Sequence, residues 1–492
     1  MASFNLVRNS RVVFTTNVSA GTNLVQATGF TTANSQEIQV LDGFSFSQAS
    51  NADTINISEA GSTPVRGQRS FNTSLANVEF SFSTYIRPRL SGTVKAEESC
   101  LLNALLCSTP IGAAAAFTGT GITTASVTVD GAGLLTIPGT GMTVTGLTVG
   151  TVYVIKGATG VGAAQFNTAV KILTKSATSI TAQYLITPTA AVTASTFPVG
   201  MTMNSTAWNE YVAVSTDTTA PQLAGAGMAY SSATTALSNK NQMLAFGMLI
   251  TVDGITYAID NCAMDQAVID FGLDGIAMVA WTGKGTALRQ LSSNVVYSAA
   301  TDPVLTGGVT GTITGKNTTA NYITNKLSTV TMIKNIGGIG AGNTSYSLAL
   351  TGGSITIANN ITYVTPANLG VVNLPIGYFV GTRAISGSMT AYLRTGSTNS
   401  AGLLSDLLAA SATSAGVEPK FRVQIEIGGI TNGTRVEVEA PGCFLQIPTI
   451  DAQAVMSTSI NFTAEGSDSV QGATAGYDIE NTNDLTIRYL SL

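Results

Sequence analysis

Residues 78–87 read VEFSFSTYIR, and residues 385–394 read ISGSMTAYLR. Both stretches alternate apolar and polar side chains with a period of two, which is typical of a β-strand with one buried face. The apolar face of the first stretch comprises Val78, Phe80, Phe82, Thr84 and Ile86. The second stretch keeps this register, with Ile385, Met389, Ala391 and Leu393 on its apolar face. The chain therefore contains one strand pattern twice, 307 residues apart.

The similarity extends to both sides of these two strands. A leucine-rich helical pattern follows each strand, at residues 97–106 and 400–408. Upstream, the matching pairs are 43–51 with 353–360 and 66–71 with 380–385, the second of which aligns Arg69 with Arg383. Downstream, residues 260–285 align without a gap on residues 441–466, at an offset of 181 that pairs Cys262 with Cys443 and Asp270 with Asp451. Because the matching segments occur in the same order in both halves of the chain, they predict two tandem copies of one domain.

The change of offset between the two halves predicts an insertion. The offsets of 307 and 181 differ by 126 residues, which is the length of a domain and not of a loop. We therefore predict a mainly β protein with three parts: a first domain of residues 1–110 plus 235–300, an inserted β-domain of residues 111–234, and a second domain of residues 301–492. The two related parts are expected to be β-sandwich or barrel domains, each with a short helix. The insert is expected to be a small sandwich or barrel of its own.

Composition excludes several classes of function. Only 10% of the 492 residues are charged and the net charge is −5, without a cluster of Lys and Arg that would bind nucleic acid tightly. The absence of histidine removes His-dependent catalysis and His-ligated metals. The longest apolar run is too short for a membrane helix and no secretory signal is visible, so we expect synthesis in the cytoplasm and no membrane association. Cys100, Cys107, Cys262 and Cys443 are expected to be core residues. We expect no cofactor, no metal site and no enzymatic activity.

Two chemical alternatives rest on single motifs. WTGKGT at 281–286 contains a Gly-rich turn with a lysine, but it lacks the glycine spacing of a phosphate-binding loop and follows a strand pattern. Asp270 and Asp451 could form a pair of catalytic carboxylates, yet the repeat explains them as the same structural residue used twice.

A surface adhesin or carbohydrate-binding β-repeat protein is the alternative from another class, because it shares the Gly- and Thr-rich, charge-poor composition. That class normally has clustered aromatics, whereas this chain has two tryptophans.

Several stretches resemble a known family. LVRNSRVVF at 6–14, the pattern SEAG-x-x-P-x-RG-x-x-x-FN at 58–72, and ITYVTP at 361–366 are similar to the major tail tube protein of long-tailed siphophages. The similarity is greatest to the subgroup with two tandem tube domains in one chain. It covers residues 1–110 and 240–492.

The resemblance implies a structural virion protein. Three chains would close into a ring with pseudo-sixfold symmetry, and stacked rings would form the hollow tail tube through which viral DNA passes to the host. The implied partners are further copies of the chain, other tail proteins at the two ends of the tube, and DNA in transit without tight or sequence-specific binding. The insert departs from the family pattern, and we expect it to be an outward-facing decoration because a domain of its size would block a channel of DNA width.

The tube function leads to candidate site residues. A channel for DNA should be poor in Lys and Arg, because each neutralised phosphate adds affinity and would slow sliding. The strand FRVQIEIGG at 421–429 is a candidate channel strand, with Gln424 and Glu426 facing the channel. We expect the extended N-terminal residues and the loop with Glu59, Arg66 and Arg69 to contact the next ring. Arg383 is a further candidate subunit contact, as the counterpart of Arg69.

Overall fold

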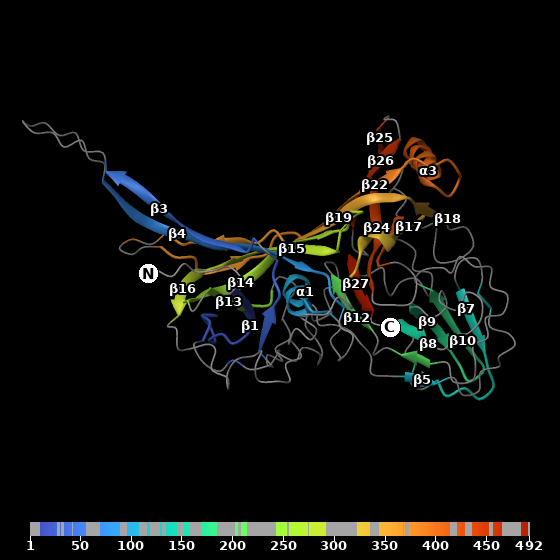
Figure 1. Ribbon diagram of the computed structural model, residues 1–492, viewed down its shortest axis with the longest axis horizontal. Helices are drawn as coiled ribbons and strands as arrows, with labels where there is room; N and C mark the ends of the chain where they lie inside the picture. The colour runs from blue at the N-terminus through green and yellow to red at the C-terminus, as the bar shows by residue number, and fades with distance from the viewer. Residues whose placement is uncertain are drawn as a thin grey trace, which may run out of the picture.

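The computed structural model describes most of the chain outside several loops (Figure 1). The described residues are 10–26, 30, 34–41, 43–55, 69–88, 96–107, 116–118, 128–129, 134–144, 147, 152–156, 169–184, 202–204, 208–213, 243–252, 255–273, 275–291, 322–334, 344–367, 369, 373–413, 421–428, 435–451, 456–464 and 484–490. Within these ranges the chain is mainly antiparallel β-structure, so the predicted fold class is confirmed. No described helix has the length and apolar character needed to cross a membrane.

The first set of strands forms two sheets that share one long strand. The outer sheet has the order β2–β1–β13–β14–β16, and the second has the order β3–β4–β15–β14. The strands are β1 (Ser10–Thr15), β2 (Ser35–Ile38), β3 (Ser45–Ile55), β4 (Arg69–Tyr85), β13 (Phe246–Val252), β14 (Ile255–Asp270), β15 (Met278–Gly285) and β16 (Ala287–Leu291). With the helix α1 (Ser99–Leu106), these strands are called the first repeat.

The second set reproduces this pairing pattern. Its outer sheet has the order β18–β17–β23–β24–β27, and its other sheet has the order β19–β22–β26, with β25 and the end of β24 beside β26. The strands are β17 (Thr329–Lys334), β18 (Thr344–Leu348), β19 (Leu350–Ala358), β22 (Ala384–Tyr392), β23 (Phe421–Ile427), β24 (Arg435–Leu445), β25 (Thr449–Asp451), β26 (Ser457–Ala464) and β27 (Leu485–Leu490). A 3₁₀ turn at Asn325–Leu327 precedes β17. With the helix α3 (Ser400–Thr413), these strands are called the second repeat.

Strand registers relate the two repeats residue by residue. Phe46 pairs with Phe80 in the first repeat, and Ile355 pairs with Gly387, 307 positions beyond Phe80, in the second. Cys262 lies opposite Phe246 and Cys443 lies opposite Phe421, and the register shifts at the same step in both places. The pairings thus follow the predicted offsets of 307 and 181 in these strands.

The gapless alignment of residues 260–285 on 441–466 is wrong in its second half. Asp270 pairs with Met278, whereas Asp451 pairs with Ser457, so the turn of the second repeat is two residues shorter. Gly285 therefore corresponds to Ala464 and not to residue 466. A turn can lose residues without moving the strands that it joins, which explains why the sequence match looked continuous.

A glycine and an aromatic ring exchange places between the repeats. In the first repeat Phe80 of β4 lies opposite Gly283 of β15, and in the second Gly387 of β22 lies opposite Phe462 of β26. In each pair a Cβ atom on the glycine would collide with the ring, so the ring covers bare backbone. An aromatic ring thus fills the equivalent space in both repeats, from β4 in the first repeat and from β26 in the second.

The main core is a cluster that runs through both repeats. It contains the inward faces of both sheets, all of the leucines of α1, and Leu403 and Leu407 of α3. The four cysteines are buried and free, which confirms their prediction as core residues.

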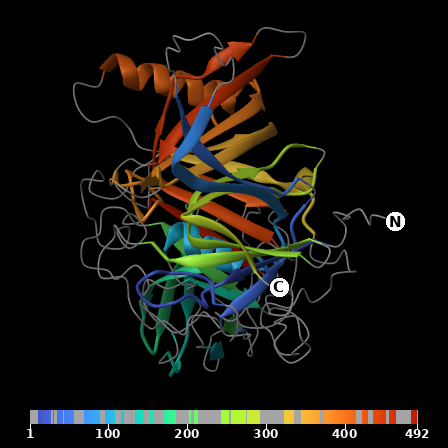
Figure 2. The same ribbon diagram turned by 90° about the vertical axis from the view of Figure 1, so that its left-hand side faces the viewer.

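The insert forms its own sheet with its own core. Its seven strands have the order β5–β11–β8–β9–β10–β7–β6, and their core is separate from that of the repeats. They are β5 (Ala116–Thr118), β6 (Thr128–Val129), β7 (Leu134–Pro138), β8 (Val152–Lys156), β9 (Ala169–Lys175), β10 (Ser179–Tyr184) and β11 (Thr202–Asn204). In Figure 2 this sheet and α3 lie at opposite ends of the molecule.

The strand β12 (Trp208–Ala213) does not belong to the insert. It pairs along its full length with β27, from Trp208 opposite Leu490 to Ala213 opposite Leu485. The predicted insert of residues 111–234 therefore extends too far, because 208–213 form an edge strand of the second repeat. Short β-runs of similar composition on both sides of this boundary hid it in the sequence.

Candidate functional site

A single sheet crosses both repeats. Strand β14 of the first repeat pairs with β19 of the second, from Gln266 opposite Ala358 to Asp270 opposite Ser354. This ladder joins the strands β3, β4, β15, β14, β19, β22 and β26 edge to edge (Figure 1). Backbone hydrogen bonds thus fix the two repeats side by side, with one face of each in a common surface.

One face of this sheet is rich in hydroxyl groups and poor in charge. Directly opposed residues of an antiparallel pair share a face, so the register defines its members. They are Ser45, Ser47, Glu79, Ser81, Ser83, Tyr85, Gln266, Val268, Asp270, Met278, Ala280, Thr282, Lys284, Gly352, Ser354, Thr356, Ala358, Ala384, Ser386, Ser388, Thr390, Tyr392, Ser457, Ser459, Asn461 and Thr463. We call this surface the hydroxyl face. The alternate residues of the same strands, such as Phe82, Trp281 and Ile355, belong to the core.

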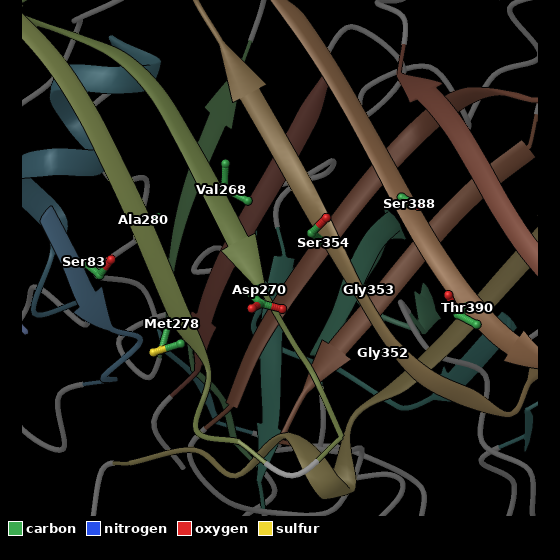
Figure 3. A pocket seen from close by; sticks show the side chains of 10 residues that line it. All are labelled: Ser83, Val268, Asp270, Met278, Ala280, Gly352, Gly353, Ser354, Ser388 and Thr390. Carbon is green, nitrogen blue, oxygen red and sulfur yellow. The ribbon is translucent and has the colours of Figure 1, made fainter. Parts of the chain in front are cut away.

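The centre of the hydroxyl face is hollow. A cavity of about 540 Å³ spans the joint between the repeats. Figure 3 shows its lining: Ser83, Val268, Asp270, Met278, Ala280, Gly352, Gly353, Ser354, Ser388 and Thr390. Gly353 lets the backbone lie close to the ring of Phe271, because a Cβ atom at this position would collide with that ring. The side chains of this lining are short, and none of them is an aromatic ring on which a sugar or base could stack.

The few charges of the hydroxyl face favour repulsion of anions. Asp270 and Glu79 are exposed carboxylates. Lys284 is held by its neighbours, since Nζ lies 2.9 Å from Asp265 Oδ2 and donates a 2.8 Å hydrogen bond to the Ile361 carbonyl. The face as defined contains no arginine. It can bind water through its hydroxyl groups, and it offers a phosphate backbone almost no free positive charge.

The predicted channel residues Gln424 and Glu426 lie elsewhere. Each is 1% exposed on β23, in the outer sheet of the second repeat, so the prediction that they face an open channel is wrong for this chain. The alternation of polar and apolar residues in this strand is typical of a strand with one solvent-facing side. Both faces of β23 are buried, and the polar one belongs to a cluster of charged side chains.

This cluster combines three arginines with three glutamates. Arg488 contacts Glu437 Oε1 at 2.6 Å and Glu439 Oε2 at 2.5 Å, and Arg422 pairs with Glu439. Arg435 Nε lies 3.5 Å from Glu426 Oε2. Burial, and next the carboxylate of Glu437 directly across the strand pair, raise the pKa of Glu426 well above its ordinary value. All of these side chains are buried, and we call them the ionic cluster.

The predicted contact residues have different outcomes. Glu59 and Arg66 lie outside the described residues. Arg69 is exposed at the start of β4, opposite Ile55. Arg383 donates hydrogen bonds to Asn359 Oδ1 at 3.0 Å and to the Leu106 carbonyl at 3.4 Å, so it lies at the joint inside the chain. Arg69 precedes the end of its strand by 16 residues and Arg383 by nine, so the register does not make them counterparts.

Helix α1 occupies the joint between the repeats, which the sequence did not reveal. Asn359 Nδ2 donates to the Leu105 carbonyl at 2.9 Å, and Arg383 reaches the Leu106 carbonyl, so the second repeat caps the helix. At the other end Tyr211 of β12 donates to Ser99 Oγ at 2.7 Å, and Tyr489 of β27 hydrogen-bonds Glu98. Burial raises the pKa of Glu98 from 4.5 to about 8, against the opposing effect of the Tyr489 hydrogen bond.

The described residues show no metal centre, since no group of three or more Cys, Asp and Glu among them could hold an ion.

Comparison with protein families finds no matching family model. Comparison with individual proteins finds the tail tube protein pb6 of Escherichia phage T5, which is 27% identical over 471 residues. The match covers 95% of this chain and 74% of that protein.

The chain is thus similar to a phage tail tube protein over nearly its whole length. This similarity over nearly the whole length confirms the family resemblance, the structural role in a phage tail and the location in the virion that the sequence predicted. The adhesin alternative receives no support from it. For a tail tube protein, the hydroxyl face is the surface whose shape and chemistry suit a passage for DNA.

Proposed function

We propose that three copies of this chain close into a ring whose inner surface is the hydroxyl face, and that stacked rings form the tail tube. The observation that carries this proposal is the continuous sheet across both repeats, with one concave face of short hydroxyl side chains. The role is structural and not catalytic. DNA passes along this surface without tight binding, because sparse carboxylates and a neutralised Lys284 give phosphates no attachment. Other tail proteins bind the two ends of the tube.

The joint inside the chain supplies a template for the joint between copies. Each repeat contributes equivalent strands, so three chains give six quasi-equivalent sectors. In the chain, Val268 pairs with Thr356 and Asp270 with Ser354. The counterparts of Val268 and Asp270 are Thr449 and Asp451 on β25, and those of Ser354 and Thr356 are Ser45 and Ser47 on β3. We therefore infer that β25 of one copy pairs with β3 of the next, with Thr449 opposite Ser47.

Burial supports this assignment. Ile269, inside the joint, is 2% exposed, whereas its counterpart Ile450 on β25 is 46% exposed. Only β26 pairs with β25 among the described strands, and only β4 pairs with β3, so one side of each strand lacks a described partner. Two unlike edges that fit each other form a head-to-tail contact, which closes into a ring when the rotation allows it.

Stacking of rings is assigned to the arms of the molecule. The hairpin of β20 (Thr362–Val364) and β21 (Gly377–Phe379) runs beside the long β3–β4 hairpin, where Leu75 donates to the Asn373 carbonyl at 2.9 Å. The arms carry exposed apolar side chains, namely Phe71, Val364, Leu369, Leu374, Ile376 and Phe379. Arg69 lies on the same arm as Phe71. We infer that these arms contact the next ring.

Paired cysteines test both the ring and its register. The variant Ser47→Cys/Thr449→Cys places one thiol at each end of a copy, while the native cysteines are all buried. After assembly and mild oxidation, we expect a covalent trimer as the largest species on a non-reducing gel, because the disulfides close a ring of three. Electron microscopy of the same sample should show hollow tubes.

The variant Val268→Cys/Thr356→Cys is the matched control, because these residues face each other across the joint inside the chain. It should form a disulfide within one copy whether or not tubes assemble. A disulfide in the control without one between copies would reject the register. A protein that never forms rings or tubes would reject the proposed function.

A further inference from the structure

Helices α1 and α3 hold the same position in the two repeats. Each helix follows the second of the strands that its repeat contributes to the shared sheet: α1 follows β4, and α3 follows β22. At the offset of 302, Leu101 and Leu105 of α1 correspond to Leu403 and Leu407 of α3, and all four are buried in the core. The inner sides of the two helices therefore match.

The outer sides of the two helices differ in burial. Every residue of α1 is buried, because the helix is enclosed between its own repeat and the second repeat. Ser405, Leu408 and Ala409 are exposed and share one side of α3, being three and four residues apart. Their counterparts Asn103, Leu106 and Cys107 are buried. Leu408 is 49% exposed, compared with 0% for Leu106.

Exposed apolar residues continue from α3 onto the neighbouring strands. Met456, just before β26, is 44% exposed, whereas its counterpart Ala277 is 0% exposed. Ile447, just before β25, and Ile450, within β25, are also exposed. Figure 1 shows α3, β25 and β26 together at one end of the molecule, far from the β3–β4 arm. This end of the second repeat thus exposes Leu408 and Met456, whose counterparts in the first repeat are buried.

We propose that α3 docks against the first repeat of a second copy of this chain, in the place that α1 takes against the second repeat. The occupant follows from the chain itself, which already contains this contact once. The proposal rests on the proposed ring, and it extends the joint from the edge of the sheet to a helix. Leu408 is its central residue, as Leu106 is in the joint inside the chain.

The contact between copies differs chemically from the contact inside the chain. Glu98 and Ser99, which hydrogen-bond Tyr489 and Tyr211, correspond to Ser400 and Ala401. By the strand offsets of 309 and 307, the capping residues Asn359 and Arg383 correspond to Ser50 and Ala76. The polar bonds that hold α1 are therefore missing, and apolar burial of Leu408 and Met456 is left as the main stabilising term. Such a contact can form late, after the joint inside each chain is complete.

Thiol labelling tests the docking without relying on a disruptive variant. Leu408→Cys should react with a polar maleimide in the dissociated chain and react at least about tenfold more slowly in assembled tubes, because docking excludes the reagent. The control is Ala177→Cys, an exposed position in the turn between β9 and β10 of the insert, which should react equally in both states. Equal reactivity of Leu408→Cys in tubes and in the dissociated chain would overturn the proposal.

A second variant measures what the contact contributes. Leu408→Ser should keep the far-ultraviolet circular dichroism of the dissociated chain and raise the protein concentration needed for tube formation about tenfold or more. Leu408→Met should assemble as the parent does. Tubes of Leu408→Ser that form at the parent's concentration would reject the helix contact and leave the proposed ring standing. Failure of the parent to form rings would instead reject the proposed function.

Discussion

The outer sheets of the two repeats have the same strand pairings, but different side chains fill most of one face. In the first repeat, one face of β13, β14 and β16 carries Leu249, Ala258 and Leu291, which pack with Val13, Val25 and Phe30 in a small apolar cluster. The register places Gln424 at the position of Leu249, and it places Glu439 and Arg488 of the ionic cluster at the positions of Ala258 and Leu291. Both faces are buried. The duplicated fold therefore depends on backbone pairing and on the inner face, and the outer face was free to change.

The two chemistries stabilise the fold in different ways. Burying apolar side chains contributes about 25 cal/mol for each Å² removed from water. A buried ion network gains less, because the cost of removing charges from water offsets much of their attraction. Breaking the network is nevertheless expensive, since the partner that stays behind becomes an unpaired buried charge. The comparison predicts that the ionic cluster is the more fragile of the two faces.

The largest effect is expected from Arg488→Met. The side chain of Arg488 contacts both Glu437 and Glu439, so its loss leaves two buried carboxylates with fewer cationic partners. We expect a loss of about 4 kcal/mol in unfolding free energy, within the range of about 3–5 kcal/mol for breaking a buried ion pair. Urea unfolding of the dissociated chain, followed by circular dichroism, measures it. The control Lys326→Met removes a cation from an exposed 3₁₀ turn and should change the urea midpoint little.

A somewhat smaller effect is expected from Leu249→Ala in the apolar cluster. The change removes buried methyl and methylene groups and leaves a cavity beside Val25 and Phe30, which costs about 3 kcal/mol. The same urea experiment measures it, and Leu24→Ala, which alters a largely exposed leucine in the loop that covers the cluster, is the control. If Leu249→Ala destabilised the chain more than Arg488→Met, the inferred fragility of the ionic face would be wrong.

The same comparison shows what the sequence could predict. The strand pattern at 78–87 and its twin led to the duplication, because the inner face of each strand must stay apolar at a period of two. That period does not reveal what covers the other face. Glu426 alternates with Ile425 and Ile427 as a surface residue would, and only the packing of β23 against the rest of the chain shows that it is buried. The ionic cluster was therefore mistaken for a channel surface.

The true candidate surface and the joint required long-range information. Ser354 and Asp270 are 84 residues apart in sequence, and the pairing of β14 with β19 brings them together. Arg383 was singled out for a contact between copies because of its apparent match with Arg69, whereas it caps α1 within the chain. A contact of this kind depends on where a helix ends in space. No local pattern of residue types encodes that position.

The smallest effect is expected at Glu98, the one carboxyl that links α1 of the first repeat to β27 of the second. Burial raises its pKa in the folded chain to about 8, from 4.5. A raised carboxyl pKa means that the folded state holds a proton which the unfolded state has released between these two pH values. The stability that Glu98 contributes is therefore fully present below about pH 4.5 and is lost as the pH rises towards about 8. Glu426, whose pKa is also raised, acts in the same direction.

Replacing Glu98 with glutamine isolates its share of this pH dependence. Glu98→Gln keeps the shape of a protonated carboxyl and cannot ionise, so the decline in urea midpoint between pH 5 and pH 8 should become shallower, and the variant should be more stable than the parent at pH 8. Glu79→Gln, on the exposed hydroxyl face, should leave the decline unchanged. An unaltered slope in Glu98→Gln would show that Glu98 is ionised in the folded chain. Glu98 would then be a buried carboxylate, as the glutamates that pair with Arg488 in the ionic cluster are, and the contrast between a protonated carboxyl at the joint and ionised carboxylates in the outer sheet would fail.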